Sequence, residues 1–326
     1  MKSATKTTGI RARLTASSLI FWLATAASAA SLNVNDVAVL HWYQADQVAS
    51  IPIDPGPFAV AFDGSSMWVG CNGTSVLYKL RASDGAILAS HSFAAGTVIE
   101  GLAFDGIRIW VTTNPNSGTP YGTVTSLLAS TGATINSSSV GSAPLGVAFD
   151  GVHIWVVNQD SNSVTILDSN GNVLNTIGVG VRPQYAAFDG ANMWVTNNDS
   201  SNVTEVRASD GKVLGNFSVG TSPIGIAFDG ANMWVANSAS NNVTKLRASD
   251  GKVLGTFPVG VYPCGIAFDG SNIWVANKVS GDVIKLRTSD GRMLDTVQVG
   301  GSPCGVAFDG AFVWVTNYNG AFVSKL

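Results

Sequence analysis

The chain has 326 residues, of which 46% are hydrophobic and only 12% are charged, and its formal net charge is −3. This composition excludes ordinary disorder and coiled coil, because both are rich in charged residues. The net charge of −3 gives no sign of the basic surface that nucleic-acid binding requires. Three cysteines are too few for a disulfide scaffold, and the length fits either two ordinary domains or one large repetitive domain.

Residues 1–30 have the pattern of a Sec-type signal peptide. A basic start precedes a short apolar stretch around residues 19–23, and small residues lead up to Ala30. Cleavage there would remove four basic residues and no acidic one, which changes the net charge from −3 to −7. We therefore expect a secreted or periplasmic protein with no membrane span after cleavage, and we expect residues 31–46 to form an N-terminal leader segment.

From residue 47 to the C-terminus, one motif is written seven times. Ala-Phe-Asp-Gly recurs at spacings of 39 to 45 residues, and a tryptophan follows each Phe by six residues. Such a period indicates a repeat fold. The seven tryptophans are Trp68, Trp110, Trp155, Trp194, Trp234, Trp274 and Trp314.

Each repeat unit contains four predicted strands. In the unit that starts at Pro223 they cover residues 225–228, 233–237, 243–247 and 253–259, which are rich in Val, Ile, Phe, Trp and Thr. Asp-Gly pairs between these runs are typical of tight hairpin turns. Seven units of four antiparallel strands predict an all-β fold, the seven-bladed β-propeller.

The two ends of the repeat region predict that the ring is closed. The last unit stops at Leu326, after its third strand, and residues 48–53 match a fourth strand without the three that should precede it. An N-terminal strand that completes the last blade accounts for both observations and covers an exposed sheet edge. A linear solenoid is the alternative, and it would need caps instead.

Two families of propellers are similar to this sequence. Trp194-Val195-Thr196-Asn197 and Trp314-Val315-Thr316-Asn317, followed by Asn-rich loops and a Pro-x-Gly step, resemble the YVTN family, and NHL repeats look similar. The resemblance covers residues 57–326 and implies a propeller whose relatives include surface-layer, binding and exported proteins.

The chain also resembles streptogramin (virginiamycin B) lyases, which are seven-bladed propellers with Pro-x-Gly turns. In that family, catalytic histidines occupy the x position and glutamates nearby act as metal ligands. None of the seven equivalent residues here is histidine, so the resemblance implies the scaffold without the catalytic histidines. These residues are Phe58, Glu100, Leu145, Gln184, Ile224, Cys264 and Cys304.

Glu100 is the candidate for a functional carboxylate, because it is the acidic residue among these seven positions at the expected channel mouth. The alternative is a solvated substitution in an irregular unit, where Ile99 replaces the usual Pro. The loops that share this face are rich in amides and aromatic rings, which suit the binding of glycans or peptides. The alternative is that these asparagines only stabilise tight turns. The ligand-binding candidates are Glu100, Arg182, Gln184, Tyr185, Tyr262, Asn198, Asn241 and Asn242.

Cys264 and Cys304 occupy the same repeat position in adjacent blades and form a possible disulfide. Neighbours on a sevenfold ring of radius R lie about 0.87R apart, so a bond with Cα atoms within about 7 Å requires R below about 8 Å. An oxidising compartment favours the bond. Duplication of a repeat could equally place two cysteines in register without one.

We expect no metal site and no cofactor. The three histidines, His41, His91 and His153, fall at unrelated positions of the repeat, whereas a metal site needs several ligands together. A ring of seven Asp residues could bind cations, but an Asp before Gly at a turn is accounted for by local hydrogen bonds.

These observations favour an exported, monomeric binding protein that recognises a protein or a cell-surface carbohydrate through the loop face. A lyase- or lactonase-like enzyme at the channel mouth is the first alternative, and a structural surface-layer component is the second. We favour a non-enzymatic role, because twelve of the 21 acidic residues belong to repeated turns.

Overall fold

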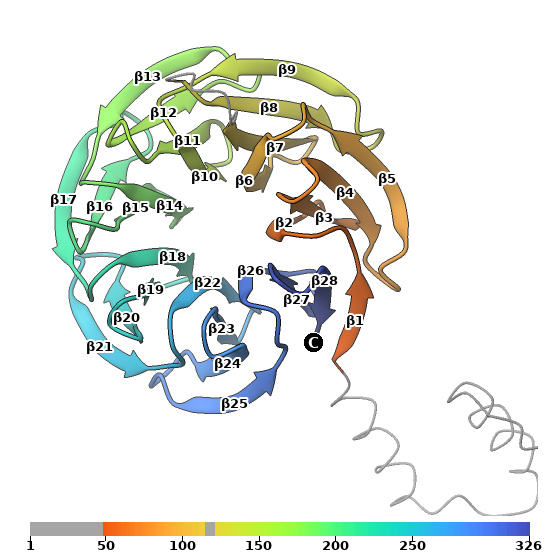
Figure 1. The fold of residues 1–326 in the computed structure, drawn as a ribbon. Helices are drawn as coiled ribbons and strands as arrows, with labels where there is room; N and C mark the ends of the chain where they lie inside the picture. The colour runs from red at the N-terminus through yellow and green to blue at the C-terminus, as the bar shows by residue number, and fades with distance from the viewer. Residues whose placement is uncertain (1–47, 115–120) are drawn as a thin grey trace, which may run out of the picture. The chain divides into compact units, whose positions relative to one another are not determined.

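In a computed structural model, which describes residues 48–114 and 121–326, seven four-stranded antiparallel sheets surround a central channel (Figure 1). The first strand of each sheet lies innermost and the fourth lies at the outer edge, so the predicted seven-bladed propeller is confirmed. The predicted signal peptide and leader lie outside the described residues. Within the described residues, no helix is long and apolar enough to cross a membrane.

We number the blades from 1 to 7 in chain order of their inner strands. The inner strands are β2 (Pro57–Phe62), β6 (Val98–Phe104), β10 (Pro144–Phe149), β14 (Pro183–Phe188), β18 (Pro223–Phe228), β22 (Pro263–Phe268) and β26 (Pro303–Phe308). The second strands are β3 (Ser66–Cys71), β7 (Arg108–Asn114), β11 (Ile154–Asn158), β15 (Asn192–Asn197), β19 (Asn232–Asn237), β23 (Asn272–Asn277) and β27 (Val313–Asn317). The third strands are β4 (Val76–Arg81), β8 (Thr123–Leu128), β12 (Ser163–Leu167), β16 (Asn202–Arg207), β20 (Asn242–Arg247), β24 (Asp282–Arg287) and β28 (Phe322–Lys325). The outer strands are β5 (Ile87–Ser92), β9 (Thr134–Ser139), β13 (Val173–Gly178), β17 (Val213–Ser218), β21 (Val253–Pro258), β25 (Met293–Gln298) and β1 (Ala49–Pro52).

The N-terminal strand completes blade 7, as predicted. β1 pairs antiparallel with β28, and Ile51 lies opposite Val323. Blade 7 also contacts blade 1 directly: the Thr316 hydroxyl donates a hydrogen bond to the Phe58 carbonyl over 2.8 Å. Lys325 Nζ donates to the Ala82 carbonyl over 2.7 Å. The ring is therefore closed both by a strand and by contacts between blades.

In every blade, the Asp of Ala-Phe-Asp-Gly accepts a hydrogen bond from the indole N–H of the tryptophan five residues later, over 2.7 to 2.8 Å. The other carboxylate oxygen accepts backbone N–H groups of the turn, as Asp229 does from Ala231 and Asn232. The predicted turn role of this Asp is thus only half of its function. Because its N–H is satisfied, the indole can be buried between two sheets.

Each tryptophan packs against the next blade around the ring. Trp234 of blade 5 lies in one buried cluster with Ile273 and Val275 of blade 6. Trp314 of blade 7 lies in one cluster with Met67 and Val69 of blade 1. The same contact that joins neighbouring blades therefore also closes the ring.

The two polar residues of the Trp-Val-Thr-Asn motif form hydrogen bonds that stabilise the fold. The Thr196 hydroxyl donates to the Ile224 carbonyl in the next blade over 2.7 Å. The buried side chain of Asn197 donates to Asn202 and Thr204 in the third strand of its own blade, over 2.8 Å each. The motif thus serves contacts within and between blades.

Removing one indole donor tests the role of the Asp–Trp hydrogen bond. In Trp234→Phe the ring remains apolar, but Asp229 loses its partner, so we expect the free energy of unfolding to fall by about 1–3 kcal/mol. Urea denaturation measures this change. The matched control is Asp250→Asn in an exposed Asp-Gly turn, where we expect a change within about 0.5 kcal/mol. Equal effects of the two substitutions would contradict this role.

Acid should destabilise the fold through the same carboxylates. Burial acts to raise the pKa of Asp63, Asp229 and Asp269, but hydrogen bonds from the tryptophan and the turn outweigh it and hold each pKa below the usual 3.8. A folded-state pKa below the unfolded value gives stability that is complete above the unfolded pKa and is lost as the pH falls through the folded pKa. We expect the urea midpoint to fall steadily below about pH 4; a midpoint that does not change there would contradict this expectation.

Candidate ligand-binding site at the channel mouth

All seven inner strands begin with an irregularity that determines where their first side chains point. Between the first residue and the middle of each inner strand, the pairing with the second strand shifts register, as between Pro183 and Ala186 of β14. A β-bulge of this kind releases residues from the ladder and re-aims their side chains. The residue at the x position of the Pro-x-Gly step, or Glu100 in blade 2, can therefore face the channel, as Glu100, Cys264 and Cys304 do.

Glycine follows this residue in most blades because the next inner strand approaches closely. A Cβ atom added to Gly265 would overlap the carbonyl oxygen of Cys304, and one added to Gly305 would overlap that of Phe58. The inner strands of neighbouring blades therefore run in backbone contact at the channel mouth.

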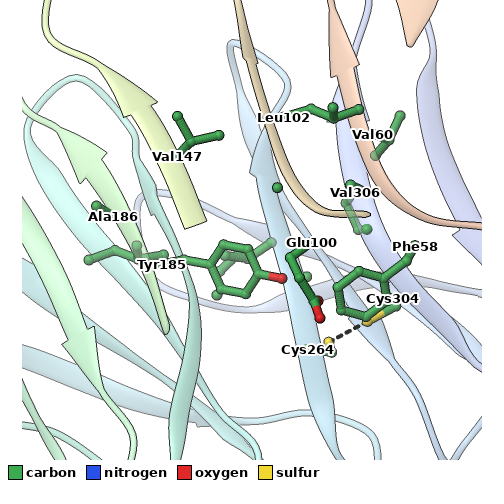
Figure 2. A pocket seen from close by; sticks show the side chains of 17 residues that line it. Phe58, Val60, Glu100, Leu102, Val147, Tyr185, Ala186, Cys264, Cys304 and Val306 are labelled. Carbon is green, nitrogen blue, oxygen red and sulfur yellow. Dashed lines mark hydrogen bonds between the residues drawn. The ribbon is translucent and has the colours of Figure 1, made fainter. Parts of the chain in front are cut away.

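The mouth opens into a small cavity of about 150 Å³ (Figure 2). In Figure 2 the carboxylate of Glu100 lies between the rings of Tyr185 and Phe58, and the sulfur atoms of Cys264 and Cys304 lie next to it. Aliphatic side chains from the inner strands form the remaining wall. Among the described residues that line the cavity, Glu100 is the one with an acidic or basic side chain.

The apolar surroundings disfavour the ionised form of Glu100. Burial raises the pKa of this carboxyl above its usual 4.5, although a hydrogen bond with the Asn114 side chain acts in the opposite direction. Burial also raises the pKa of Tyr185 well above its ordinary value, and the neighbouring Cys304, Cys264 and Glu100 add to this effect. A positively charged group entering the cavity would therefore be attracted to the carboxylate more strongly than at an exposed site.

The two cysteines meet at the mouth as predicted from their repeat position. Their sulfur atoms lie 2.7 Å apart, and both residues are buried and present as thiols. The hydrogen bond with Cys304 lowers the pKa of Cys264 despite burial, and the charge of Lys278 acts in the same direction. The same hydrogen bond and burial raise the pKa of Cys304. The predicted disulfide itself stays a prediction.

Several exposed apolar side chains, which together we call the mouth rim, stand in the loops at the end of the blades where the inner strands begin. The loop after β23 pairs with the segment before β22, because the backbone N–H of Lys278 donates to the Tyr262 carbonyl and that of Val279 donates to the Val261 carbonyl. The Tyr318 ring stands edge-on against Phe58, with ring centroids 6.1 Å apart. The mouth rim consists of Val181, Val261, Tyr262, Val279 and Tyr318, all of which are exposed.

Only Tyr262 of the mouth rim was among the sequence candidates. The valines and Tyr318 were missed because they stand in loops, where single exposed apolar residues are common. A signal was present nonetheless: Val-Arg and Val-Tyr occupy loop positions where residues 142–143 are Ser-Ala and residues 221–222 are Thr-Ser, and Lys278-Val279 stands where two other units carry Gln-Asp and Asn-Asp. Their gathering at one face could be recognised only after the blades were placed around the ring.

The asparagines among the predicted ligand-binding residues form hydrogen bonds that stabilise the loops of this face. Asn241 accepts a hydrogen bond from the Tyr262 backbone N–H over 2.9 Å, and Asn242 accepts one from a buried asparagine of β19 over 2.8 Å. Asn198 donates to the carbonyl at the start of β18 over 3.3 Å. These side chains therefore position the backbone around the mouth.

The two polar candidates of blade 4 differ in exposure. Gln184 is buried and donates to the Arg182 carbonyl over 3.2 Å. Arg182 is exposed, and its Nε lies 3.9 Å from the Asp199 carboxylate. Arg182 therefore presents a positive charge beside the mouth rim, whereas Gln184 supports the turn.

The two histidines among the described residues lie away from the mouth. His153 lies 3.3 Å from Asp150 at the opposite end of its blade, and His91 packs against Phe93 in the outer strand β5; His41 falls outside the described residues. Across 48–114 and 121–326, no three His, Cys, Asp or Glu side chains are placed to hold a metal ion.

Solved structures of the same fold share little sequence with this chain. A selenomethionine-substituted virginiamycin B lyase from Staphylococcus aureus has a TM-score of 0.72 at 18% identity, covering 86% of this chain and 98% of the lyase. A streptogramin B lyase has the same TM-score, identity and coverage of this chain, with 96% of its own chain covered. U3-55K has a TM-score of 0.73 at 12% identity, covering 86% of this chain and 98% of its own. At these identities, the similarities show the propeller fold alone.

No protein-family model and no curated protein matches the sequence. The resemblance to YVTN and NHL repeats therefore stays an expectation.

Replacing the mouth carboxylate should stabilise the protein at neutral pH. A carboxyl whose folded-state pKa lies above its unfolded value loses stability as the pH rises from the unfolded toward the folded pKa. Glu100→Gln removes this loss, so we expect a higher urea midpoint than wild type at pH 7 and equal midpoints near pH 4. Asp160→Asn, in an exposed loop, is the control. A lower midpoint for Glu100→Gln at pH 7 would contradict the assignment.

Proposed function

We propose that the protein is an exported β-propeller that binds a protein partner through the mouth rim and the cavity beneath it. The observation that carries the proposal is the combination of exposed valine and tyrosine side chains with one half-buried carboxylate in the cavity at the same face. Large apolar side chains exposed together at one face of a protein are typical of interaction sites.

Two features favour a protein over the carbohydrate alternative. The rim contains three exposed valines, Val181, Val261 and Val279, and aliphatic side chains offer sugars no aromatic face to stack on. The cavity of about 150 Å³ is also smaller than the roughly 300 Å³ at which pockets for small molecules begin. It suits the end group of one side chain from a docked partner.

The charge of the mouth favours a basic side chain as that end group. Glu100 is held in surroundings that disfavour its ionised form, and the rings of Phe58 and Tyr185 stand on either side of it (Figure 2). A lysine ammonium or arginine guanidinium would neutralise the carboxylate and contact aromatic faces at the same time.

Export rests on the pattern of residues 1–30, with its basic start, apolar centre and small residues before Ala30. Expression of the full chain in a bacterial host tests it. We expect recovery outside the cytoplasm with a new N-terminus near residue 30. Recovery in the cytoplasm with Met1 or Lys2 still present would contradict this part of the proposal.

A lyase- or lactonase-like activity at the same mouth is the second candidate. The observation that favours it is that Glu100, Tyr185 and two thiols share one cavity, since active sites gather titratable groups with perturbed pKa values. This candidate expects turnover of a lactone or ester substrate that Glu100→Gln abolishes while binding persists. A binding protein shows loss of affinity and no turnover.

Binding can be tested with two defined probes, a random-peptide phage library and a glycan array. We expect enrichment of peptides that carry lysine or arginine, with affinity at least tenfold weaker in Glu100→Gln and reduced in Val279→Ser. Val152→Ser is the matched control, because Val152 lies at the opposite end of its blade and both valines are 67% exposed. Binding of glycans alone, or equal affinities of all three variants, would overturn the protein-partner proposal.

A further inference from the structure

Cys264 and Cys304 occupy matching places in adjacent blades. Each is the second residue of its inner strand, in β22 and β26. They share one buried cluster with Ile224, and Phe58 and Tyr185 pack against it. Because Gly265 lies in backbone contact with Cys304, the two strands are already as close as a cross-link between them requires.

The side chains also point toward each other. Their sulfur atoms lie 2.7 Å apart, and the residues are 7% and 3% exposed. Both line the cavity that opens at the channel mouth, so a small reagent entering the mouth meets this pair directly.

We infer that Cys264 and Cys304 form a reversible disulfide that joins blades 6 and 7. The oxidant is a second disulfide, of a small molecule or of an exported oxidoreductase. Cys264 attacks it as a thiolate and forms a mixed disulfide, with release of one thiol of the oxidant. The Cys304 sulfur then attacks the Cys264 sulfur and releases the second thiol. One S–S bond is formed and one is broken, two electrons pass to the oxidant, and its two sulfurs take up the two protons from the cysteines.

The local chemistry supports this order of attack. The hydrogen bond with Cys304, aided by Lys278, favours the thiolate of Cys264. The same hydrogen bond and burial raise the pKa of Cys304, which favours its protonated form. A thiolate is the attacking species in disulfide exchange, so Cys264 reacts first and Cys304 resolves the mixed disulfide.

The bond would strengthen the part of the ring that contains the seam. It closes a loop of 40 residues and ties blade 6 to blade 7, the blade that β1 completes. Cross-links over loops of this length stabilise mainly by restricting the unfolded chain. The bond would also remove two ionisable thiols from the cavity that holds Glu100, so the redox state would change the electrostatics of the mouth.

Cys71 provides an internal control. It lies at the end of β3, fully buried, and burial together with the Asp54 carboxylate raises its pKa to about 12. It is a free thiol with no role in the proposed bond. The chain contains only these three cysteines, so a count of thiols tests the proposal directly.

The experiment counts thiols in the purified full chain after treatment with oxidised glutathione or with dithiothreitol. The treated protein is freed of reagent, unfolded in guanidinium and reacted with Ellman's reagent. We expect one thiol after oxidation and three after reduction, with a Cys264–Cys304 cross-linked peptide in the digest of the oxidised protein. We also expect reduction to lower the melting temperature by about 5 °C.

Three variants complete the test. Cys264→Ser and Cys304→Ser should each lose the cross-linked peptide and the shift in melting temperature between the two treatments. Cys71→Ser should keep both, with no thiol after oxidation and two after reduction. Three thiols after oxidation, glutathione retained on a single cysteine, or a cross-link that includes Cys71 would overturn the inference. None of these results depends on the proposed binding function.

Discussion

The hydrogen bond between the Asp of each Ala-Phe-Asp-Gly turn and the indole N–H five residues later supports the rest of the structure. A tryptophan can be buried between two sheets only if its N–H finds an acceptor. Asp229 accepts the indole of Trp234 and two backbone N–H groups of its turn. The same indole packs on blade 6. One carboxylate therefore stabilises a turn and fixes the tryptophan that packs against the next blade. The chain repeats this arrangement seven times.

The Asp–Trp hydrogen bond stabilises the blade interfaces and the end of each inner strand. The residues at the beginning of each inner strand can therefore vary. The Asp turn follows the inner strand, whereas the register shift and the mouth residue lie at its beginning. Blades can therefore differ at the mouth without losing the contacts that hold the ring. Glu100 makes use of this freedom, since it is a carboxyl with a raised pKa in apolar surroundings. The ring tolerates this unfavourable position because the packing between its blades stabilises it elsewhere.

The ring and its closure could be predicted because they follow from the number of repeat units and from the number of strands in each unit. A unit that lacks its fourth strand and an N-terminal segment that supplies one fit together in only a few ways, and β1 pairs with β28 accordingly. Strand limits were predicted to within about two residues, as in β21, predicted over 253–259 and found at Val253–Pro258. The hydrogen bond from the indole to each Asp was not predicted, because the local hydrogen bonds of an Asp-Gly turn already explained the presence of the aspartate.

The neighbours of Glu100 could not be predicted from the sequence. Which side chains meet across a channel depends on the ring radius and on the register shifts of several strands far apart in sequence. Tyr185 and Phe58 flank Glu100 although they belong to blades 4 and 1. The φ angles of Arg182 and Tyr262 are positive, at +51° and +60°, and they orient the loops before β14 and β22. Arginine and tyrosine rarely adopt such angles, so the sequence does not indicate this conformation. The lyase structures share the scaffold at 18% identity, so the scaffold places few constraints on the residues at the mouth, where the units of this chain depart from their own repeat.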